Sequence, residues 1–426
     1  MRSVDLKYGR SSIAFNFDGS DLTVLQAATL DLPLSDADVG ELLDQPIDSP
    51  SLEDLVSPGE SVLIVVPDAT RTTAAGQVVN LLVRRLIANG TAPHDLHIIF
   101  ATGIHRRVTP DEKAAMLTPF IMQRITTYDH DPRDLMQIVR VGETGGGIPV
   151  ELNRRLVEHQ HIVIVGGVTF HYFAGFTGGR KLVCPGLASS RTVADTHKLA
   201  FDCGTMERRS GVDTGLLAGN AVHEAFVEAA SFTSPIFAIN TIVNDTGEAV
   251  RLFCGDWLSS HRAACDAYAA DHTVSIKDLR DLVIVSCGGY PLDINMIQAH
   301  KALDAAARAC TPGGTIVLVA ECADGLGRSD FLKWFEAGSS HRIAERLCGR
   351  YQVNGQTAWS LKQKTERYRV RCLSSLPSDV LGTMGMEKLS GPGALDLARK
   401  GYVIPDGAKT TVRLDQAAFT EKVLAI

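Results

Sequence analysis

Three absences narrow the class of this protein before any motif is considered. The sequence has no run of about 18 or more apolar residues, so we expect no membrane-spanning segment and no membrane partner. Basic residues form no block, and 49 acidic residues outnumber 42 basic ones for a net charge of −7, so we expect no nucleic-acid partner. The N-terminus reaches charged residues at once and lacks the apolar stretch of a secretory signal.

Cysteine also lacks a pattern. The nine cysteines are scattered along the chain and are never spaced C-x-x-C. This spacing argues against a zinc knuckle and against a disulfide framework. It favours reduced thiols, which cytoplasmic proteins keep, so the sequence predicts a cytoplasmic location.

What the sequence does have is an alternation of β-branched runs and helical patterns. The first run, residues 61–66, is closed by Pro67 and Asp68, and apolar residues at helical spacing follow over 76–89. Further strands are predicted at 96–100, 161–165, 236–240, 281–286, 315–319 and 369–376, and further helices at 111–117 and 259–271. The alternation predicts an α/β fold with mainly parallel sheets.

The pattern restarts near residues 270–280, which predicts two α/β domains. We expect an N-terminal domain over 1–272 and a smaller C-terminal domain over 278–409. The last segment, 410–426, is expected to return to the first domain.

Polar side chains follow three of the predicted strands in the first domain. Asp68 and Arg71 come after one strand, His105 after the next and His171 after the third. Ligands of parallel sheets bind beyond the carboxyl ends of the strands, so we expect these residues to line a ligand site. Arg71 has the planar fork that holds a carboxylate at two points. The alternative is a capping Asp68 beside an exposed Arg71.

A glycine-rich stretch runs from Gly166 to Lys181. Its glycines let backbone N–H groups approach an anion, and Arg180 and Lys181 add positive charge. Leu182 follows Lys181, so the stretch lacks the hydroxyl of a Walker A loop. Two interpretations stay open, a tight structural turn and a cradle for a phosphate-bearing ligand.

Three histidines stand out from the ten others, which we expect to be solvated or structural. His105, His171 and His197 each neighbour glycine or charged residues. Imidazole titrates near neutral pH and suits both proton transfer and metal binding. Spacing alone leaves open a zinc site made of all three, and hence a zinc-dependent hydrolase or lyase.

Gln298 and Lys301 form the last candidate pair, three residues apart and so on one face of a predicted helix. They are placed to reach across a cleft between the domains, and solvent exposure is the ordinary alternative.

Taken in order, the motifs resemble one family. They are Asp68-x-Thr70-Arg71, Thr102-Gly103-x-His105-Arg106, His171 with Gly179-Arg180-Lys181-x3-Pro185-Gly186, the pair His197-Lys198, and Gly289-x-Pro291-x-Asp293-x4-Gln298-x2-Lys301. Over residues 60–305 this series resembles the nickel-dependent lactate racemases. The resemblance implies two domains with the active site in the cleft between them.

The resemblance also implies a cofactor, a nickel-pincer nucleotide whose two sulfur-bearing arms hold the metal. By resemblance, Lys181 is tethered to this cofactor and His197 supplies the protein's ligand to nickel. The residues expected to lie close to the cofactor are Asp68, Gly175, Gly178 and Gly179. Cofactor-maturation enzymes are then expected as partners.

For the reaction, the resemblance implies inversion of the C2 stereocentre of a 2-hydroxy acid by hydride transfer to that cofactor. His105 and His171 are expected to be the acid/base pair, because a reaction on two faces requires two such groups. Arg71, Gln298 and Lys301 are expected to bind the substrate.

The sequence departs from the family pattern at one position. Ile297 precedes Gln298 in this sequence. The family resemblance implies tyrosine at this position in the members that racemise lactate. With isoleucine at this position, the expected substrate is a 2-hydroxy acid that is lactate-like or larger, and a different side chain at C3 would suit the change. A further alternative is a non-catalytic protein that binds a nucleotide or a hydroxy acid, although such a protein needs no pair of acid/base histidines.

Overall fold

The structure is a computed structural model, and its chain divides into two compact units. The N-terminal unit comprises Thr29–Ala200 and Ser210–Ala270, and the C-terminal unit comprises Met1–Ala28, Phe201–Arg209 and Asp271–Ile426. The residues that the structure describes are 3–17, 21–28, 32–69, 72–233, 235, 237–395 and 400–415.

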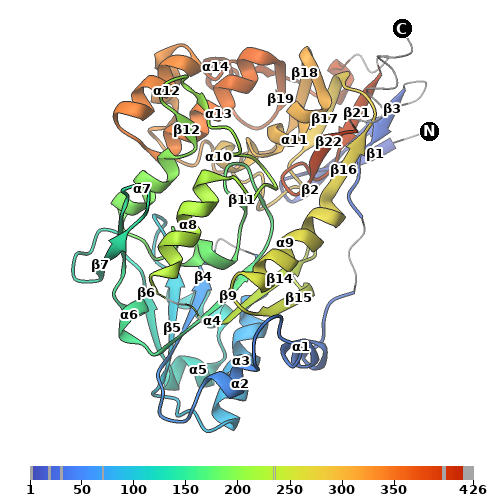
Figure 1. Ribbon diagram of the computed structural model, residues 1–426. Helices are drawn as coiled ribbons and strands as arrows, with labels where there is room; N and C mark the ends of the chain where they lie inside the picture. Colours follow the sequence, from blue (N-terminus) through green and yellow to red (C-terminus); the bar gives the residue numbers. More distant parts are fainter. Residues whose placement is uncertain are drawn as a thin grey trace. The chain divides into compact units, whose positions relative to one another are not determined.

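The N-terminal unit is built on a six-stranded sheet in the order β15-β14-β9-β4-β5-β6 (Figure 1). All neighbouring pairs are parallel except β14 and β15, which are antiparallel. The strands are β4 (Val62–Pro67), β5 (Leu96–Ala101), β6 (Thr126–Asp129), β9 (His161–Gly167), β14 (Phe237–Val243) and β15 (Ala249–Gly255). Every residue of β4 is buried, as the uninterrupted β-branched run predicts for a central strand of a parallel sheet.

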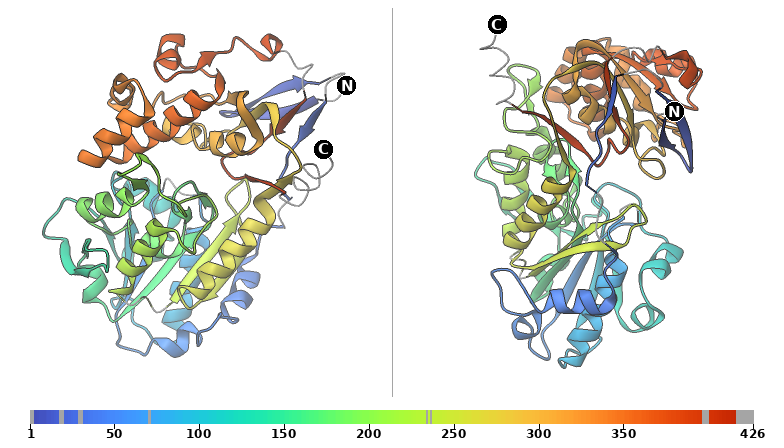
Figure 2. Two further views of the ribbon diagram at one scale, coloured as in Figure 1. Left: turned by 45° about the horizontal axis from the view of Figure 1, so that its top comes forward. Right: turned by 90° about the vertical axis from the view of Figure 1, so that its right-hand side faces the viewer.

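Helices cover both faces of this sheet. Apolar side chains of α1 (Asp36–Leu43) and α3 (Ala75–Ala88) form one core with alternate residues of β4, β5, β9 and β14. On the other face α9 (Ser259–His272) packs along β14 and β15 (Figures 1 and 2).

Short elements complete the N-terminal unit. They are α2 (Leu52–Leu55), α4 (Pro110–Met116), α5 (Pro119–Arg124), β7 (Ile138–Glu143), β8 (Pro149–Asn153), α6 (Arg155–Glu158), β10 (Phe170–His171), β11 (Gly175–Phe176), the 3-10 helix η1 (Gly179–Leu182), α7 (Ser190–Lys198) and α8 (Ala221–Ser231).

The C-terminal unit has a second six-stranded sheet, in the order β20-β19-β18-β17-β21-β3 and parallel throughout. Its strands are β3 (Leu22–Val24), β17 (Arg280–Ser286), β18 (Cys310–Val319), β19 (Arg369–Leu373), β20 (Glu387–Lys388) and β21 (Gly401–Ile404). Within this unit α12 (Ser340–Gly349) and α13 (Val353–Arg367), both orange, lie side by side (Figures 1 and 2).

The helices of the C-terminal unit are α10 (Met296–Ala299), α11 (Ala302–Ala309), η2 (Phe331–Ala337), α12 (Ser340–Gly349), α13 (Val353–Arg367), α14 (Ser378–Thr383) and η3 (Pro392–Ala394). Three two-stranded sheets accompany them: β1 (Ser3–Tyr8) with β2 (Ser11–Asn16), β12 (Phe201–Asp202) with β13 (Glu207–Arg208), and β16 (Thr273–Ile276) with β22 (Thr411–Leu414).

These findings confirm the predicted α/β fold with mainly parallel sheets. The division of the chain differs from the predicted one at its ends. β3 joins the second sheet through β21, and β22 pairs with β16, so both terminal segments that the structure describes belong to the C-terminal unit. Strands of three or four residues are too short to show a periodic pattern, and pairing with distant strands decides their place.

The prediction that all cysteines are reduced thiols was wrong. Cys203 and Cys348 form a disulfide whose Cα atoms are 5.8 Å apart, across 145 residues of sequence. The other seven cysteines are free and buried. A bond between residues so far apart in sequence has no local spacing signature, and only the docking of the β12–β13 hairpin against α12 brings the two sulfurs together.

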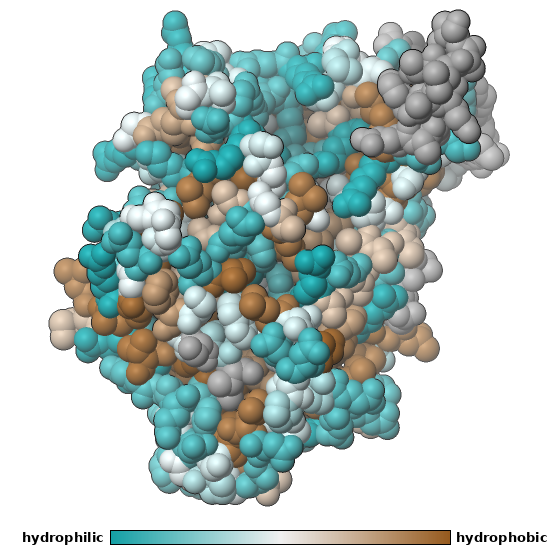
Figure 3. All heavy atoms as spheres, viewed as in Figure 1, coloured by the Kyte–Doolittle hydropathy of each residue, from teal (hydrophilic) through white to brown (hydrophobic). Residues whose placement is uncertain are grey.

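Among the described residues, no helix is long and apolar enough to cross a membrane. On the face shown in Figure 3, hydrophobic and hydrophilic residues are interspersed over the N-terminal unit. Some large apolar side chains are exposed, among them the adjacent Leu135 at 84% and Met136 at 74%.

Candidate active site

The carboxyl edge of the N-terminal sheet brings together two of the predicted site residues. β4 and β5 are parallel neighbours, and Asp68 and the turn that carries His105 follow their ends. The Nδ1 atom of His105 lies 2.7 Å from Oδ2 of Asp68. Asp68 is buried, whereas the His105 side chain is 45% exposed.

This contact sets the proton arrangement of His105. A carboxylate only accepts hydrogen bonds, so Nδ1 of His105 carries the hydrogen. In the neutral ring, Nε2 then holds the lone pair and is able to take up a proton. Asp68, which we expected beside the cofactor, is therefore engaged with His105 in this structure.

His171 is held in the opposite way. It lies on the short β10–β11 hairpin, where it pairs with Gly175. The backbone N–H of Ala174 donates to Nδ1 of His171 at 3.2 Å, and the ring packs edge-on against Phe173 with centroids 4.3 Å apart. Because Nδ1 accepts this bond, Nε2 carries the hydrogen in the neutral ring. One imidazole thus presents a lone pair and the other an N–H group.

The glycine-rich stretch folds around Arg180, which is buried with 1% of its surface exposed. Its Nη2 donates to the carbonyl of Ala174 at 2.7 Å, and its Nη1 donates to the carbonyls of Thr177 and Gly178, each at 3.4 Å. Burial lowers the pKa of Arg180 to about 10, so the side chain stays charged at neutral pH. Arg180 therefore binds the loop itself, not an exposed anion as the sequence suggested.

Two further side chains hold the same loop. Nε2 of His261, on α9, lies 2.9 Å from the carbonyl oxygen of Thr177 and 3.1 Å from Nη1 of Arg180. Asn220, the N-cap of α8, donates from Nδ2 to the carbonyl of Phe173 at 3.0 Å. The turn that follows His171 is thus fixed through its backbone from two sides.

The glycines of the loop have reasons inside the protein. Gly179 has φ +49°, and a Cβ atom there would lie 2.6 Å from the ring of His261. Gly175 has φ +76°, and a Cβ atom there would lie 2.1 Å from the carbonyl oxygen of Leu216. Contact with protein atoms, together with the left-handed backbone, is sufficient to require glycine at both positions.

Lys181 and His197 approach the same two aromatic rings. Nζ of Lys181 lies 5.6 Å from the ring centroid of Phe173 and 5.2 Å from that of Phe226. The ring of His197, on α7, lies 5.2 Å and 5.3 Å from the same centroids. Burial, and next the charge of Lys181, lower the pKa of His197 to about 3. His197 is therefore neutral at physiological pH, as a metal ligand must be.

The remaining predicted residues belong elsewhere. Arg71 lies outside the described residues. Gln298 and Lys301 are in the C-terminal unit, where Nζ of Lys301 donates to Oε1 of Gln298 at 2.6 Å. The single predicted helix is in fact two short ones, because α10 ends at Ala299 and Lys301 caps α11. Ile297 is partly buried and packs against the core of this unit.

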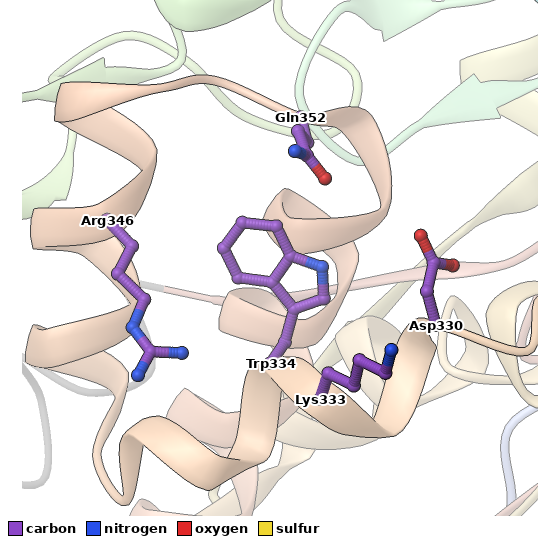
Figure 4. A pocket seen from close by; sticks show the side chains of 5 residues that line it. All are labelled: Asp330, Lys333, Trp334, Arg346 and Gln352. Carbon is purple, nitrogen blue, oxygen red and sulfur yellow. The ribbon is translucent and has the colours of Figure 1, made fainter.

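The three-histidine zinc site is not supported. Within the described part of the chain, no group of three or more His, Cys, Asp and Glu side chains is placed to hold one metal ion. His105 is tied to Asp68, and His197 packs between aromatic rings. A pocket of about 230 Å³ in the C-terminal unit contains none of the predicted site residues; it is lined by Asp330, Lys333, Trp334, Arg346 and Gln352 (Figure 4).

Comparisons with known proteins decide the family. The model of the lactate racemase N-terminal domain matches residues 8–207, and the model of the C-terminal domain matches residues 276–367. The lactate racemase of Thermoanaerobacterium thermosaccharolyticum is 30% identical over 340 residues, which cover 79% of this chain and 78% of that protein. The lactate racemase of Lactiplantibacillus plantarum is 33% identical over 336 residues, 78% of this chain and 77% of that protein.

The chain belongs to the lactate racemase family. It is accordingly an isomerase of the racemase class. Solved structures agree: the lactate racemase apoprotein from T. thermosaccharolyticum superposes with a TM-score of 0.87 at 27% identity, over 97% of this chain and 100% of that one. A crystal structure from Thermotoga maritima shares the fold, with a TM-score of 0.67 at 21% identity over 91% of this chain and 100% of that one.

Two residues that hold the loop, His261 and Asn220, were not predicted to do so, although His261 has one of the two roles expected for it, a structural one. We expected His261 to be solvated or structural, and Asn220 was not considered. The sequence around Asn220 does carry a signal, since an Asn before the apolar pattern of α8 is a preferred N-cap. The burial of Arg180 and its contact with His261 depend on α9 and have no local signature.

Proposed function

We propose that this chain inverts the C2 stereocentre of a 2-hydroxy acid, with His105 and His171 as the acid/base pair and a nickel-pincer nucleotide as the cofactor. Membership of the lactate racemase family supports the reaction class. The observation that carries the assignment of the pair is the opposite hydrogen bonding of the two imidazoles, Nδ1–H to Asp68 in one and Nδ1 from Ala174 in the other.

His105 is the group that takes the proton from the substrate hydroxyl. Its Nε2 carries the lone pair, and the imidazolium that forms is stabilised by the buried carboxylate of Asp68 at 2.7 Å. His171 presents Nε2–H to the reacting oxygen. To give that oxygen its proton as the hydroxyl re-forms, His171 enters the step as an imidazolium and leaves it as a neutral imidazole, so that the proton gained by His105 balances the proton lost by His171. The two roles exchange for the opposite enantiomer, which requires His171 to release the N–H of Ala174.

The residues of the N-terminal unit fit the proposed cofactor. Lys181 offers an amine for the covalent tether, and His197 offers a neutral imidazole for nickel; both approach Phe173 and Phe226. A buried imidazole whose pKa is about 3 stays deprotonated and available to a metal. When bound, this cofactor accepts hydride from C2 and returns it.

Substrate binding falls to Arg71, Gln298 and Lys301. The bond between Lys301 and Gln298 holds the ammonium group and the amide side by side, which suits the carboxylate and hydroxyl of a 2-hydroxy acid. The curated relatives are named for lactate. Ile297 stands where the family resemblance implies tyrosine in the lactate-racemising members. We therefore propose a substrate whose side chain at C3 is larger or more apolar than that of lactate.

A panel of single enantiomers of 2-hydroxy acids tests the function. The protein is produced in a host that makes the cofactor, and the appearance of the other enantiomer is followed by chiral chromatography. We expect turnover by the wild type, and a loss of turnover in His105→Gln and His171→Gln. The matched control is His94→Gln, since the His94 side chain is 83% exposed. Ligand binding without turnover in the loaded wild type would favour the non-catalytic binding protein.

A further inference from the structure

The buried charge of Arg180 takes no direct part in the proposed chemistry. Among the described residues, no carboxylate pairs with this guanidinium; its partners are the carbonyls of Ala174, Thr177 and Gly178 and the ring of His261. Burial of a guanidinium without a counter-charge is costly, because the ion loses its water. A lysine, which offers one point charge, could not hold three carbonyls and a ring in these directions.

Ala174 links this charge to His171. Its carbonyl accepts the shortest of the Arg180 hydrogen bonds, at 2.7 Å, while its N–H donates to Nδ1 of His171 at 3.2 Å. Asn220 holds the preceding carbonyl, that of Phe173, at 3.0 Å. The carbonyl of Phe173 and the N–H of Ala174 belong to one peptide plane, so Asn220 sets the direction of that N–H toward the imidazole, and Arg180 fixes the following plane through the carbonyl of Ala174.

We propose that Arg180 is a positioning residue for His171: through Ala174 it holds the ring as the Nε2–H tautomer and in one orientation. His261 supports this arrangement through Nε2: in one tautomer it accepts from Nη1 of Arg180 at 3.1 Å, and in the other it donates to the carbonyl of Thr177 at 2.9 Å. Gly179 gives the ring of His261 the room to do so. The tautomer follows from the geometry alone, whereas the effect on catalysis rests on the proposed function.

Arg180→Lys tests this assignment, with two readouts on the full chain. In the apoprotein labelled with ¹⁵N-histidine, the tautomer of His171 is read by NMR and assigned with His171→Gln. In the loaded enzyme, kcat and KM are measured, and the mass of the covalent adduct shows whether Lys181 is still modified. We expect a single Nε2–H tautomer in the wild type and a mixture in Arg180→Lys, with kcat lowered about tenfold or more and KM within about threefold.

Cys265→Ala is the matched control. Its sulfur lies 3.4 Å from Nε2 of His261 in the same buried cluster, yet it is not bonded to the loop carbonyls. If the effect of Arg180→Lys came from a general loss of packing, Cys265→Ala would show the same effect. If it comes from the lost hydrogen bonds of the Arg180 guanidinium, Cys265→Ala will not show it. We expect Cys265→Ala to keep the Nε2–H tautomer of His171.

An Arg180→Lys variant that retains a single Nε2–H tautomer and a kcat within about twofold of Cys265→Ala would overturn the proposal. If Arg180→Lys does not fold, His261→Phe serves in its place: it removes the ring nitrogen, and the same mixture of tautomers is expected. An unchanged His171 signal in that variant also counts against the proposal. A wild type that racemises no 2-hydroxy acid would contradict the proposed function. The NMR result would still decide whether Arg180 sets the tautomer of His171.

Discussion

Replacing Asp68 by asparagine isolates what the carboxylate does for His105. The two side chains have nearly the same volume, and Asp68 is only 4% exposed, so the cavity stays filled. What changes is the charge opposite Nδ1 of His105, 2.7 Å away. With a carboxylate, Nδ1–H is the only possible donor and Nε2 is the base. With an amide, the NH₂ group is also able to face Nδ1, which moves the ring hydrogen to Nε2 and removes the base.

The magnitude follows from the kind of bond. A hydrogen bond to a charged group contributes about 1.5–3 kcal/mol, and it strengthens when His105 becomes an imidazolium. If this hydrogen-bond free energy is lost only in the transition state, kcat decreases about 10- to 150-fold. Full inversion of the tautomer has cost about 10⁴-fold in kcat in the serine protease triad, where an asparagine replaces the corresponding aspartate.

The assay is the steady-state rate of conversion of each enantiomer by the loaded enzyme, together with the ¹⁵N signal of His105. Glu60→Gln is the matched control, because Oε2 of Glu60 lies 2.8 Å from Nε2 of His161, the first residue of β9, in a similar carboxylate–imidazole pair. We expect a lower kcat, a small change in KM and an altered His105 signal in Asp68→Asn, and none of these in Glu60→Gln. A kcat for Asp68→Asn within about twofold of the control would refute the reasoning.

Three further outcomes are expected. Lys181→Arg keeps the positive charge but lacks the amine, so we expect its intact mass, after expression with the cofactor pathway, to lack the nucleotide adduct of the wild type; an adduct of equal yield would contradict the tether. Burial lowers the pKa of His130 to about 4 and that of His261 well below its usual value, so the unfolded state binds protons more readily than the folded state below about pH 6.5, and stability falls as the pH falls, down to about pH 4 for His130. Urea unfolding should show lower stability at pH 5 than at pH 7, by about 2 kcal/mol for His130 with a further loss from His261, and equal stability at the two pH values would be inconsistent with these burials. Peptide mapping without reductant should give a linked Cys203–Cys348 peptide, and alkylation of both residues in unreduced, unfolded protein would contradict the disulfide.

The predictable part of the structure consists of long buried strands and the residues at their ends. The run at 61–66 gave β4 within one residue, and it placed Asp68 at the edge where it meets His105. Parallel strands end at one edge of a sheet, so their positions in the sequence suffice to group such residues. Family motifs added Lys181 and His197, whose side chains approach the same two rings.

The parts that could not be predicted depend on contacts between distant segments. Arg180 looked like a cation for a ligand, and only the packing of α9 shows that it faces inward toward His261. The disulfide depends on packing of the β12–β13 hairpin within the C-terminal unit, although the residues that flank this hairpin in the sequence belong to the N-terminal unit. The spacing of apolar residues along a strand or a helix carries no information about contacts between distant segments.

The most direct test of the central claim is racemisation in D₂O. The loaded enzyme is incubated with one enantiomer of a 2-hydroxy acid, and both the enantiomer ratio and the hydrogen at C2 are followed, by chiral chromatography and ¹H NMR. Transfer of hydride away from C2 and back, with His105 and His171 handling only the hydroxyl proton, predicts the opposite enantiomer with protium retained at C2. Deuterium at C2 in the product, or no conversion of any acid by an enzyme shown to carry nickel and the adduct, would contradict the account.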